Sequence, residues 1–350
     1  MLKDIIKEIF PVEKEFLAKA QDHLDNLTKP RGSLGRLEEI AARLCAINHG
    51  NNPSVDPGLI YTCAADHGVA ASGVSMFPRE VTRQMVMNFL NGGAAINVLS
   101  KAAGLKLKVV DVGVMGNDFA PHDLLISRKI MPGTKDLSLG PAMDEATCLM
   151  AVELGVELAD RAHSQGIRTL CTGEMGIGNT TSSTALYCAF LGLDPLKLAG
   201  AGTGLGAAGI KHKARVIARG LEMNKQAING KDPLKILSAL GGLEIACLTG
   251  IILGGAKNRM NIIIDGYIST SSYVCALKMN PFVRDYCFFS HLSAESGHLM
   301  VMKEINARPV LNMNMRLGEG TGAAMAFFFL KCAADIYNNM ATFDQAGVSR

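Results

Sequence analysis

The sequence predicts an α/β protein with a largely parallel β-sheet. From about residue 58, short segments rich in β-branched or apolar residues alternate with longer stretches rich in Ala, Leu and Met. Such alternation is typical of βα units, whose parallel strands are connected by helices that cover the sheet. Polar and glycine-rich segments follow the apolar ones directly, as at the edge of such a sheet. The predicted strands are GLIYTCAA (58–65), LKLKVVDVGV (105–114), IRTLCT (167–172), MNIIID (260–265), CFFSH (287–291) and PVLNM (309–313).

Both ends of the chain predict helices. Apolar residues recur at helical spacing from Phe16 to Leu27 and again from Leu37 to Ile47, with the turn TKPRGSLGR between them. A strongly apolar helix begins at residue 321 and ends near AADIYNNM. We expect this last helix to pack back on the N-terminal pair.

Composition excludes several classes of protein. With 48% apolar and 19% charged residues the chain can build a large core, and a net charge of +3 does not favour a nucleic-acid or membrane partner. There is no Trp, and the longest apolar stretches are too short to span a bilayer. The nine cysteines are scattered without a C-x-x-C pair, which argues against zinc and disulfides. Together with the lack of a signal-peptide core, this predicts a cytoplasmic protein without a metal site.

Ionisable and glycine-rich segments follow each predicted strand. In an open parallel sheet these strand ends meet at one edge, where ligands bind. Three histidines in or near these segments, His67, His291 and His298, lie far apart in sequence, so we expect polar or capping roles rather than a metal site. The segments are Asp66-His67-Gly68, Asp111, the loop 173–181, Asp265-Gly266, Ser290-His291 and the loop 316–320.

A single carboxylate, Glu319, lies between glycines in RLGEGTG, immediately before the apolar stretch AAMAFFFL. One interpretation is a helix start, with Glu319 near the positive end of the helix dipole. The other is a catalytic carboxylate on a backbone that lets a ligand come close. We prefer the catalytic interpretation because five other predicted strands also end in polar, glycine-rich segments.

Two glycine-rich loops are candidate anion sites. GEMGIGNTTSS follows a strand and begins a helix, so its backbone N–H groups favour phosphate; the alternative is a turn with Asn179 or Thr180 as N-cap. It lacks the Gly-Lys-Ser/Thr of a P-loop, which argues against nucleoside triphosphate hydrolysis. AGAGTGLGAAGIKHK contains a G-x-G-x-x-G pattern but no preceding strand, which favours a second anion loop completed by Lys211 over dinucleotide binding.

Taken together, these loops resemble one family, the nicotinate-nucleotide:dimethylbenzimidazole phosphoribosyltransferases of the cobamide lower-ligand pathway. The resemblance covers nearly the whole chain in order. It runs through KPRGSLGRLE (29–38), DHGVAASGVSMFPREVTRQM (66–85), NFLNGGAAINVL (88–99), GEMGIGNTTSS (173–183), GTG (202–204), SHLSAESGH (290–298) and LGEGTGAA (317–324).

The resemblance implies a reaction and a catalytic residue. The ribose 5-phosphate of nicotinate mononucleotide moves to a nitrogen of a benzimidazole, with inversion at the anomeric carbon. Glu319 matches the family's catalytic carboxylate, and an apolar surround would raise its pKa toward the working pH. No cofactor and no magnesium are implied. The preferred base stays open.

Further site residues are implied by the same match. Glu174 is expected to order the nucleotide or assist proton movement. The candidate base-binding residues are Ser75, Pro78, Gln84, Met85, Met175 and Leu317. The candidate phosphoribosyl-binding residues are Gly176, Gly178, Asn179, Thr180, Gly202, Thr203, Gly204, Lys211, Ser293 and Gly297.

The family's fold agrees with the derived one and implies two domains and a homodimer. We expect a small helical domain from residues 1–50 with 321–350, and a Rossmann-like, three-layer catalytic domain from residues 51–320. Two alternative functions are weighed against the transferase: a dinucleotide-dependent oxidoreductase that uses the loop 202–209, and a non-catalytic nucleotide or azole sensor that would not need Glu319.

Overall fold

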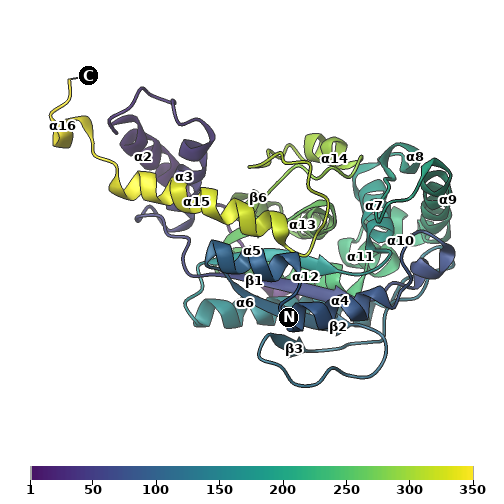
Figure 1. Cartoon of the computed structure of the whole chain (residues 1–350). Helices are drawn as coiled ribbons and strands as arrows, with labels where there is room; N and C mark the ends of the chain where they lie inside the picture. The colour runs from purple at the N-terminus through teal and green to yellow at the C-terminus, as the bar shows by residue number, and fades with distance from the viewer. Residues whose placement is uncertain (1, 350) are drawn as a thin grey trace.

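A computed structural model describes residues 2–349 and contains a six-stranded sheet in which every strand pairing is parallel (Figure 1). The strand order is β3-β2-β1-β4-β5-β6, the order of a Rossmann fold. This confirms the predicted α/β class with a mainly parallel sheet. The strands are β1 (Gly58–Ala65), β2 (Lys106–Gly113), β3 (Leu125–Ser127), β4 (Thr169–Met175), β5 (Asn261–Ile264) and β6 (Cys287–Phe289).

Five of the six predicted strands form, and one does not. The segment 309–313 runs beside β6 but makes only the isolated bridge between His291 and Leu311, so its prediction as a strand was wrong. Strand β3 was not predicted, because it is only three residues long and partly exposed.

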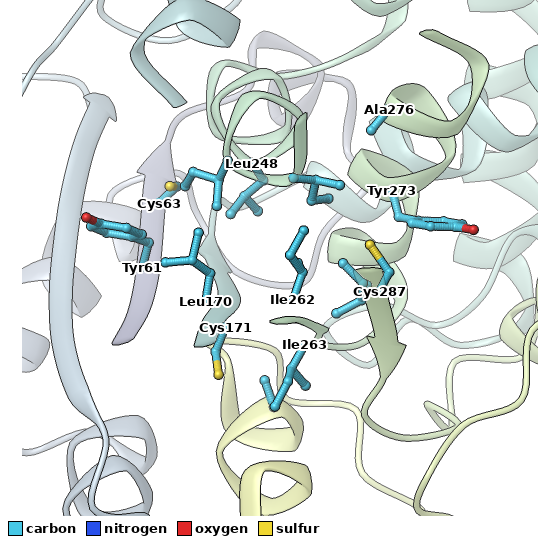
Figure 2. Close-up of a cluster of buried hydrophobic side chains, with 14 of the residues drawn as sticks. Tyr61, Cys63, Leu170, Cys171, Leu248, Ile262, Ile263, Tyr273, Ala276 and Cys287 are labelled. Atoms are coloured by element: carbon cyan, nitrogen blue, oxygen red, sulfur yellow. The ribbon is translucent and has the colours of Figure 1, made fainter. Parts of the chain in front are cut away.

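Helices cover both faces of the sheet. The helices α6 (Glu145–Ser164) and α12 (Leu243–Lys257) lie on one face, and α5 (Ala95–Ala103) and α15 (Thr321–Asn339) lie on the other. Figure 2 shows that side chains alternate between the two faces of the sheet. Leu170 and Ile262 point toward α12, while their neighbours Cys171 and Ile263 point toward α15. Strands β1 and β5 are buried on both faces, and their sequences are therefore almost continuously apolar.

Glycines let the two helices on the first face approach closely. Helix α12 is apolar on all sides and almost entirely buried. A Cβ at Gly155 of α6 would lie 1.9 Å from the carbonyl oxygen of Cys247, and one at Gly250 of α12 would lie 1.9 Å from that of Val152. Both contacts are to backbone, which cannot move aside without separating the helices.

A helical group is inserted between β4 and β5 and lies at one end of the sheet (Figure 1). It contains α7 (Asn179–Leu191), α8 (Pro195–Leu198), α9 (Ala207–Met223), α10 (Lys225–Asn229) and α11 (Pro233–Leu240). Helices η1 (Gly68–Ser72) and α4 (Val81–Leu90) follow β1, helices α13 (Tyr267–Met279) and η2 (Pro281–Tyr286) connect β5 to β6, and α14 (His298–Glu304) follows β6.

The two chain ends meet, as expected from the sequence. Helices α2 (Lys14–Asp25) and α3 (Arg36–Ile47) lie beside the C-terminal half of α15, away from the sheet (Figure 1). The backbone N–H of Thr28 donates to the carbonyl of Ala341 at 3.0 Å, and the N–H of Phe343 donates to that of Asn26 at 3.0 Å. Short helices α1 (Leu2–Lys7) and α16 (Phe343–Ala346) complete the ends. The division into two domains stays a prediction.

None of the helices between residues 2 and 349 combines the length and the apolarity that a membrane crossing requires.

The close approach of α6 and α12 generates a stability prediction. Gly155→Ala should lower the free energy of unfolding by about 1–3 kcal/mol, because the added methyl group overlaps the Cys247 carbonyl. This loss opposes the gain of roughly 1 kcal/mol that Ala normally brings to a helix. The control is Gly140→Ala, where an added Cβ meets nothing within 4 Å. Urea unfolding that finds Gly155→Ala as stable as the control would contradict the packing account.

Candidate active site

A cavity of about 600 Å³ opens at the carboxyl edge of the sheet, where the chain leaves β4, β5 and β6. The strand order reverses between β1 and β4, so their connections diverge and leave a crevice at this point. Glu174 and Met175 come from the end of β4, Gly266 follows β5, and His291 follows β6. The loop before α15 closes the cavity on the side of Glu319.

The turn that carries Glu319 has three consecutive residues in the left-handed region. Their φ angles are +87° at Gly318, +64° at Glu319 and +97° at Gly320. A non-glycine residue in this region costs roughly 1–2 kcal/mol, so surrounding contacts must hold it. The Thr62 hydroxyl donates to the Glu319 carbonyl at 2.8 Å, and Asp265 accepts the N–H of Gly320 at 3.1 Å.

The Glu319 side chain is buried and lines the cavity. Its Oε2 atom has no hydrogen-bond partner among residues 2–349. Burial raises the pKa of Glu319, the charge of Asp265 raises it further, and a hydrogen bond from the N–H of Ile96 opposes the rise. Unlike the Glu of an ordinary helix start, this carboxylate keeps one oxygen available to a ligand and is a stronger base than an exposed Glu.

Glu174 is the second carboxyl group of the cavity. Burial raises its pKa to about 8, and the charges of Asp265, Glu244 and Glu319 add to this rise. The Asn179 amide donates to its Oε2 atom. A Cβ at Gly318 would lie 2.2 Å from its Oε1 atom, so the Glu319 turn packs directly on this carboxyl group. Glu174 is therefore mostly protonated at neutral pH and can donate a hydrogen bond.

The opposite part of the cavity is suited to an anion. The N-terminus of α7, with Asn179 and Thr180, faces the cavity, and the glycine loop at Gly202 lies beside it. The ammonium group of Lys213, fully buried, donates to the Thr180 hydroxyl at 2.7 Å. Burial lowers the pKa of Lys213 to about 8, although the charge of Glu295 opposes this. A bound anion would favour the charged form of this lysine.

Hydrogen bonds join the loops around the cavity mouth. The Arg316 guanidinium donates to the Gly202 carbonyl at 2.9 Å, and the Gly202 N–H donates to Glu295 at 3.0 Å. The Thr203 hydroxyl accepts the N–H of Met76 at 2.9 Å and is hydrogen-bonded to the Ser75 hydroxyl at 3.0 Å. The loops before α4, α9 and α15 are thus connected at the rim.

Apolar side chains form a wall of the cavity. Phe77 and Leu317 line it although 52% and 58% of their respective surfaces are exposed. Large exposed apolar residues that border a cavity are typical of a site for a flat apolar ring. The other apolar residues of this wall are Val74, Val81, Met85, Met175 and Ile177.

Most of the residues predicted from the sequence lie together in this cavity. Those that line it are Ser75, Met85, Glu174, Met175, Gly176, Gly178, Asn179, Thr180, Gly202, Thr203, Ser293, Leu317 and Glu319. Five predicted residues lie outside its lining: Pro78, Gln84, Gly204, Lys211 and Gly297.

Helix phase explains two of these five positions. Val81 and Met85, four residues apart on α4, face the cavity, whereas Gln84 faces a second hollow of about 340 Å³. Lys211 is exposed, and Lys213, two residues later on α9, points to the opposite side and reaches Thr180. The structure therefore replaces Lys211 with Lys213 at the anion end.

The other three predicted residues lie outside the cavity lining for local reasons. Pro78 is exposed before α4, Gly204 is exposed in the loop before α9, and Gly297 packs against Leu198, where a Cβ would lie 2.6 Å from the carbonyl oxygen.

Some residues of the site were not predicted. Lys213 could have been found from periodicity, because it shares the apolar face of α9 with Val216 and Ile217. Most of the others lie on loops, where no periodicity identifies the residues that face inward, whereas Val81 begins α4 and Tyr267 and Ile268 begin α13. They are Val74, Phe77, Val81, Ile177, Tyr267, Ile268 and Gly318, together with Gly266, His291, Glu295 and Arg316, for which no role in binding was predicted.

The structure disfavours the dinucleotide alternative. The G-x-G-x-x-G pattern at 204–209 follows α8 and a loop rather than a strand, and it leads into α9. The dinucleotide motif requires a strand, a tight turn and a helix in immediate succession.

Sequence and fold match known proteins along nearly the whole chain. A family model described as Phosphoribosyltransferase matches residues 9–348. Two relatives named nicotinate-nucleotide–dimethylbenzimidazole phosphoribosyltransferase come from Nitratidesulfovibrio vulgaris (strain DP4) and Chlorobaculum tepidum. The first is 54% identical over 349 residues, which cover 99% of this chain and 98% of the relative. The second is 50% identical over 347 residues, with the same coverage. The crystal structure of CobT from Thermus thermophilus matches with a TM-score of 0.91 and 44% identity, and covers 96% of this chain and 99% of that one.

The depressed pKa of Lys213 predicts how anion binding depends on pH. Lys213 is charged below its pKa of about 8 and neutral above it, so affinity for ribose 5-phosphate should fall as pH rises from about 7 to about 9.5. The limit is about tenfold for each pH unit above the pKa. Lys213→Met should remove this dependence and weaken binding, whereas Lys211→Met should change neither. If calorimetry found that Lys211→Met causes the larger loss of affinity for ribose 5-phosphate, Lys211 and not Lys213 would be the anion-binding lysine.

Proposed function

The chain belongs to the nicotinate-nucleotide–dimethylbenzimidazole phosphoribosyltransferase family, and we propose that it transfers the 5-phosphoribosyl group of nicotinate mononucleotide to 5,6-dimethylbenzimidazole or a related base. The products are nicotinate and α-ribazole 5′-phosphate, which supplies the nucleotide loop of cobamides. One observation carries the proposal: Glu319, a buried carboxylate with one oxygen unpaired among residues 2–349, shares a cavity with Thr180, which accepts a hydrogen bond from the buried ammonium group of Lys213.

The leaving group needs no acid. In nicotinate mononucleotide the pyridine nitrogen already carries a positive charge, and it takes the electron pair of the broken glycosidic bond as it departs. Nicotinate therefore leaves with a neutral ring nitrogen, and no proton has to be delivered to it. A cavity that offers a base, Glu319, in its lining supports this reaction, in which only the attacking base has an excess proton.

The attacking base must lose a proton, and Glu319 is suited to accept it. One ring nitrogen of the benzimidazole bonds to the anomeric carbon, while the N–H on the other nitrogen gives its proton to the Glu319 carboxylate. The raised pKa of Glu319 favours this transfer. The flanking glycines carry no side chains that would hold a planar ring away from the turn.

The two carboxyl groups of the cavity have different tasks in this proposal. Glu319 acts as the base. Glu174, which is mostly protonated at neutral pH because its pKa is about 8, acts as a hydrogen-bond donor that orders the nucleotide. Environments that separate the protonation states of neighbouring carboxyl groups are typical of sites with distinct acid and base roles.

Binding of the two substrates follows from the polarity of the cavity. The 5′-phosphate lies at the N-terminus of α7, near Thr180, Gly202 and Lys213. The benzimidazole lies against the apolar wall, with Met85, Met175 and Leu317 on its faces and Ser75 at the rim. Phe77, exposed at the edge of this wall, extends the surface that selects the base.

The protein is proposed to act as a homodimer in the cytoplasm. Phe328 on α15 and Val98 on α5 are 60% and 63% exposed on helices that pack against each other. Large exposed apolar side chains on two helices that pack together support association of two copies. All nine cysteines are free thiols, which supports a reducing compartment.

Replacing the base tests the proposed chemistry. Glu319→Gln should lower kcat for ribotide formation by about 10²–10⁴, because Gln cannot accept the proton. In the wild type, kcat/KM should fall as pH decreases through the raised pKa of Glu319, and the variant should lose this acidic limb. Products would be followed by mass-resolved chromatography with dimethylbenzimidazole, benzimidazole, adenine and p-cresol as competing acceptors.

Glu319→Asp is the matched control, since it keeps the carboxylate and should retain more activity than Gln. Unchanged turnover in Glu319→Gln would contradict the role of Glu319. A folded wild type that binds the nucleotide but forms no ribotide with any acceptor would instead support the sensor.

Disrupting the exposed apolar area tests the dimer. The wild type should sediment as a dimer, and Phe328→Asp should shift it to the monomer because a buried, unpaired charge opposes association. Leu139→Asp, at another exposed apolar residue, should leave the dimer intact. A monomeric wild type at micromolar concentration in sedimentation velocity would reject the proposed interface.

A further inference from the structure

His291 occupies a tight position in the wall of the cavity. The residue follows β6 in the chain, and its side chain is almost completely buried. The ring is enclosed by two glycines: a Cβ at Gly322 would lie 2.0 Å from Nδ1, and a Cβ at Gly266 would lie 3.2 Å from Cε1. Gly266 and Gly322 therefore fix the ring in one orientation.

Hydrogen bonds around Ser290 determine which ring nitrogen of His291 carries hydrogen. The Ser290 hydroxyl donates its single hydrogen to the Asp265 carbonyl at 3.0 Å. The 2.9 Å contact between Ser290 Oγ and His291 Nδ1 must then use a hydrogen on Nδ1. In the neutral ring, Nε2 is consequently an acceptor, and it has no partner among residues 2–349 although it is buried.

A second buried histidine, His298 at the start of α14, shows the contrast. The Thr270 hydroxyl donates to the Gly266 carbonyl at 2.9 Å, so His298 Nε2 donates to Thr270 Oγ1 at 3.2 Å. His298 Nδ1 in turn accepts the Ser293 N–H at 2.8 Å. Both nitrogens of His298 are satisfied within the protein, whereas His291 keeps one open.

The open nitrogen lies beside Gly266 in the lining of the cavity. A Cβ at Gly266 would lie 3.4 Å from His291 Nε2 and 3.9 Å from Ser293 Cβ, and all three residues line the cavity. On one side, His291 contacts Gly322 behind the Glu319 turn. On the other, the loop from Ser293 leads to Glu295, which holds Gly202 at the anion end. The sugar of a bound nucleotide has to connect these two ends.

We propose that His291 Nε2 accepts a hydrogen bond from a ribose hydroxyl of the donor nucleotide and so selects ribose over deoxyribose. This inference rests on the proposed function. A phosphate monoester is mostly the dianion at neutral pH and then has no hydrogen to donate to an acceptor, whereas a sugar hydroxyl always has one. The bond positions the anomeric carbon, so His291 is a binding and specificity residue and not the proton acceptor.

Two substitutions separate the open nitrogen from the rest of the ring. His291→Asn keeps an N–H donor for Ser290 at the position of Nδ1 but removes the acceptor at Nε2. His291→Gln can place its amide oxygen near the position of Nε2. The donors are nicotinate mononucleotide and its 2′-deoxy and 3′-deoxy analogues. Melting temperatures would show that each variant is folded.

With nicotinate mononucleotide, His291→Asn should lower kcat/KM by about 10- to 100-fold, because a ligand hydroxyl loses its partner. With the deoxy analogue that lacks this hydroxyl, the same substitution should change kcat/KM by less than about twofold, since neither protein can make the bond. His291→Gln should recover most of the activity lost in His291→Asn.

An equal loss with all three donors would overturn the proposal, since His291 would then only support the fold of the wall. No loss with any donor would also overturn it and would leave solvent as the partner of Nε2. Calorimetry with ribose 5-phosphate and 2-deoxyribose 5-phosphate supplies a readout without turnover. If the wild type formed no ribotide, the proposed function would fail, but the binding comparison would still test the role of His291.

Discussion

The site depends on the interaction of Asp265 with the beginning of α15. One oxygen of this buried carboxylate accepts the N–H of Gly320 and the other accepts the N–H of Ala323 at 2.9 Å. Hydrogen bonds to a charged group stabilise by roughly 1.5–3 kcal/mol each, enough to offset roughly 1–2 kcal/mol for a left-handed Glu319. Gly173 makes the approach possible, because a Cβ there would lie 2.4 Å from the Glu319 carbonyl oxygen. The strained turn is held by the sheet beneath it.

The protonation of the groups around the cavity depends on the same burial and close approach of side chains. Burial raises the pKa of Glu174 and of Glu319, the charge of Asp265 raises both further, and the charge of Glu319 adds to the rise at Glu174. At the other end, burial lowers the pKa of Lys213. Both effects reduce the charge that the cavity has to keep buried. A nucleotide with an anionic phosphate and a cationic pyridinium ring complements these two ends: in the proposed binding mode the phosphate favours charged Lys213 and the ring lies toward the carboxylates.

The sequence predicted the fold well because buried parallel strands leave a continuous apolar signal. It failed at β3 and at 309–313, where pairing is short and decided by neighbouring chain segments. For the site, motifs identified the loops but not the direction of each side chain. Lys211 and Lys213 look equivalent in GIKHKAR, yet only the phase of α9 turns Lys213 toward Thr180. Likewise the open nitrogen of His291 depends on Ser290 and Asp265, which no sequence pattern connects.

The central claim is that Glu319, held in its left-handed turn, takes the proton from the attacking base. The most direct measurement is a crystal structure with 5,6-dimethylbenzimidazole bound. The account predicts a Glu319 carboxylate oxygen within hydrogen-bond distance, about 2.6–3.2 Å, of a ring nitrogen of the base. A complex in which Glu174 or a backbone carbonyl holds that nitrogen, with Glu319 turned away, would contradict it.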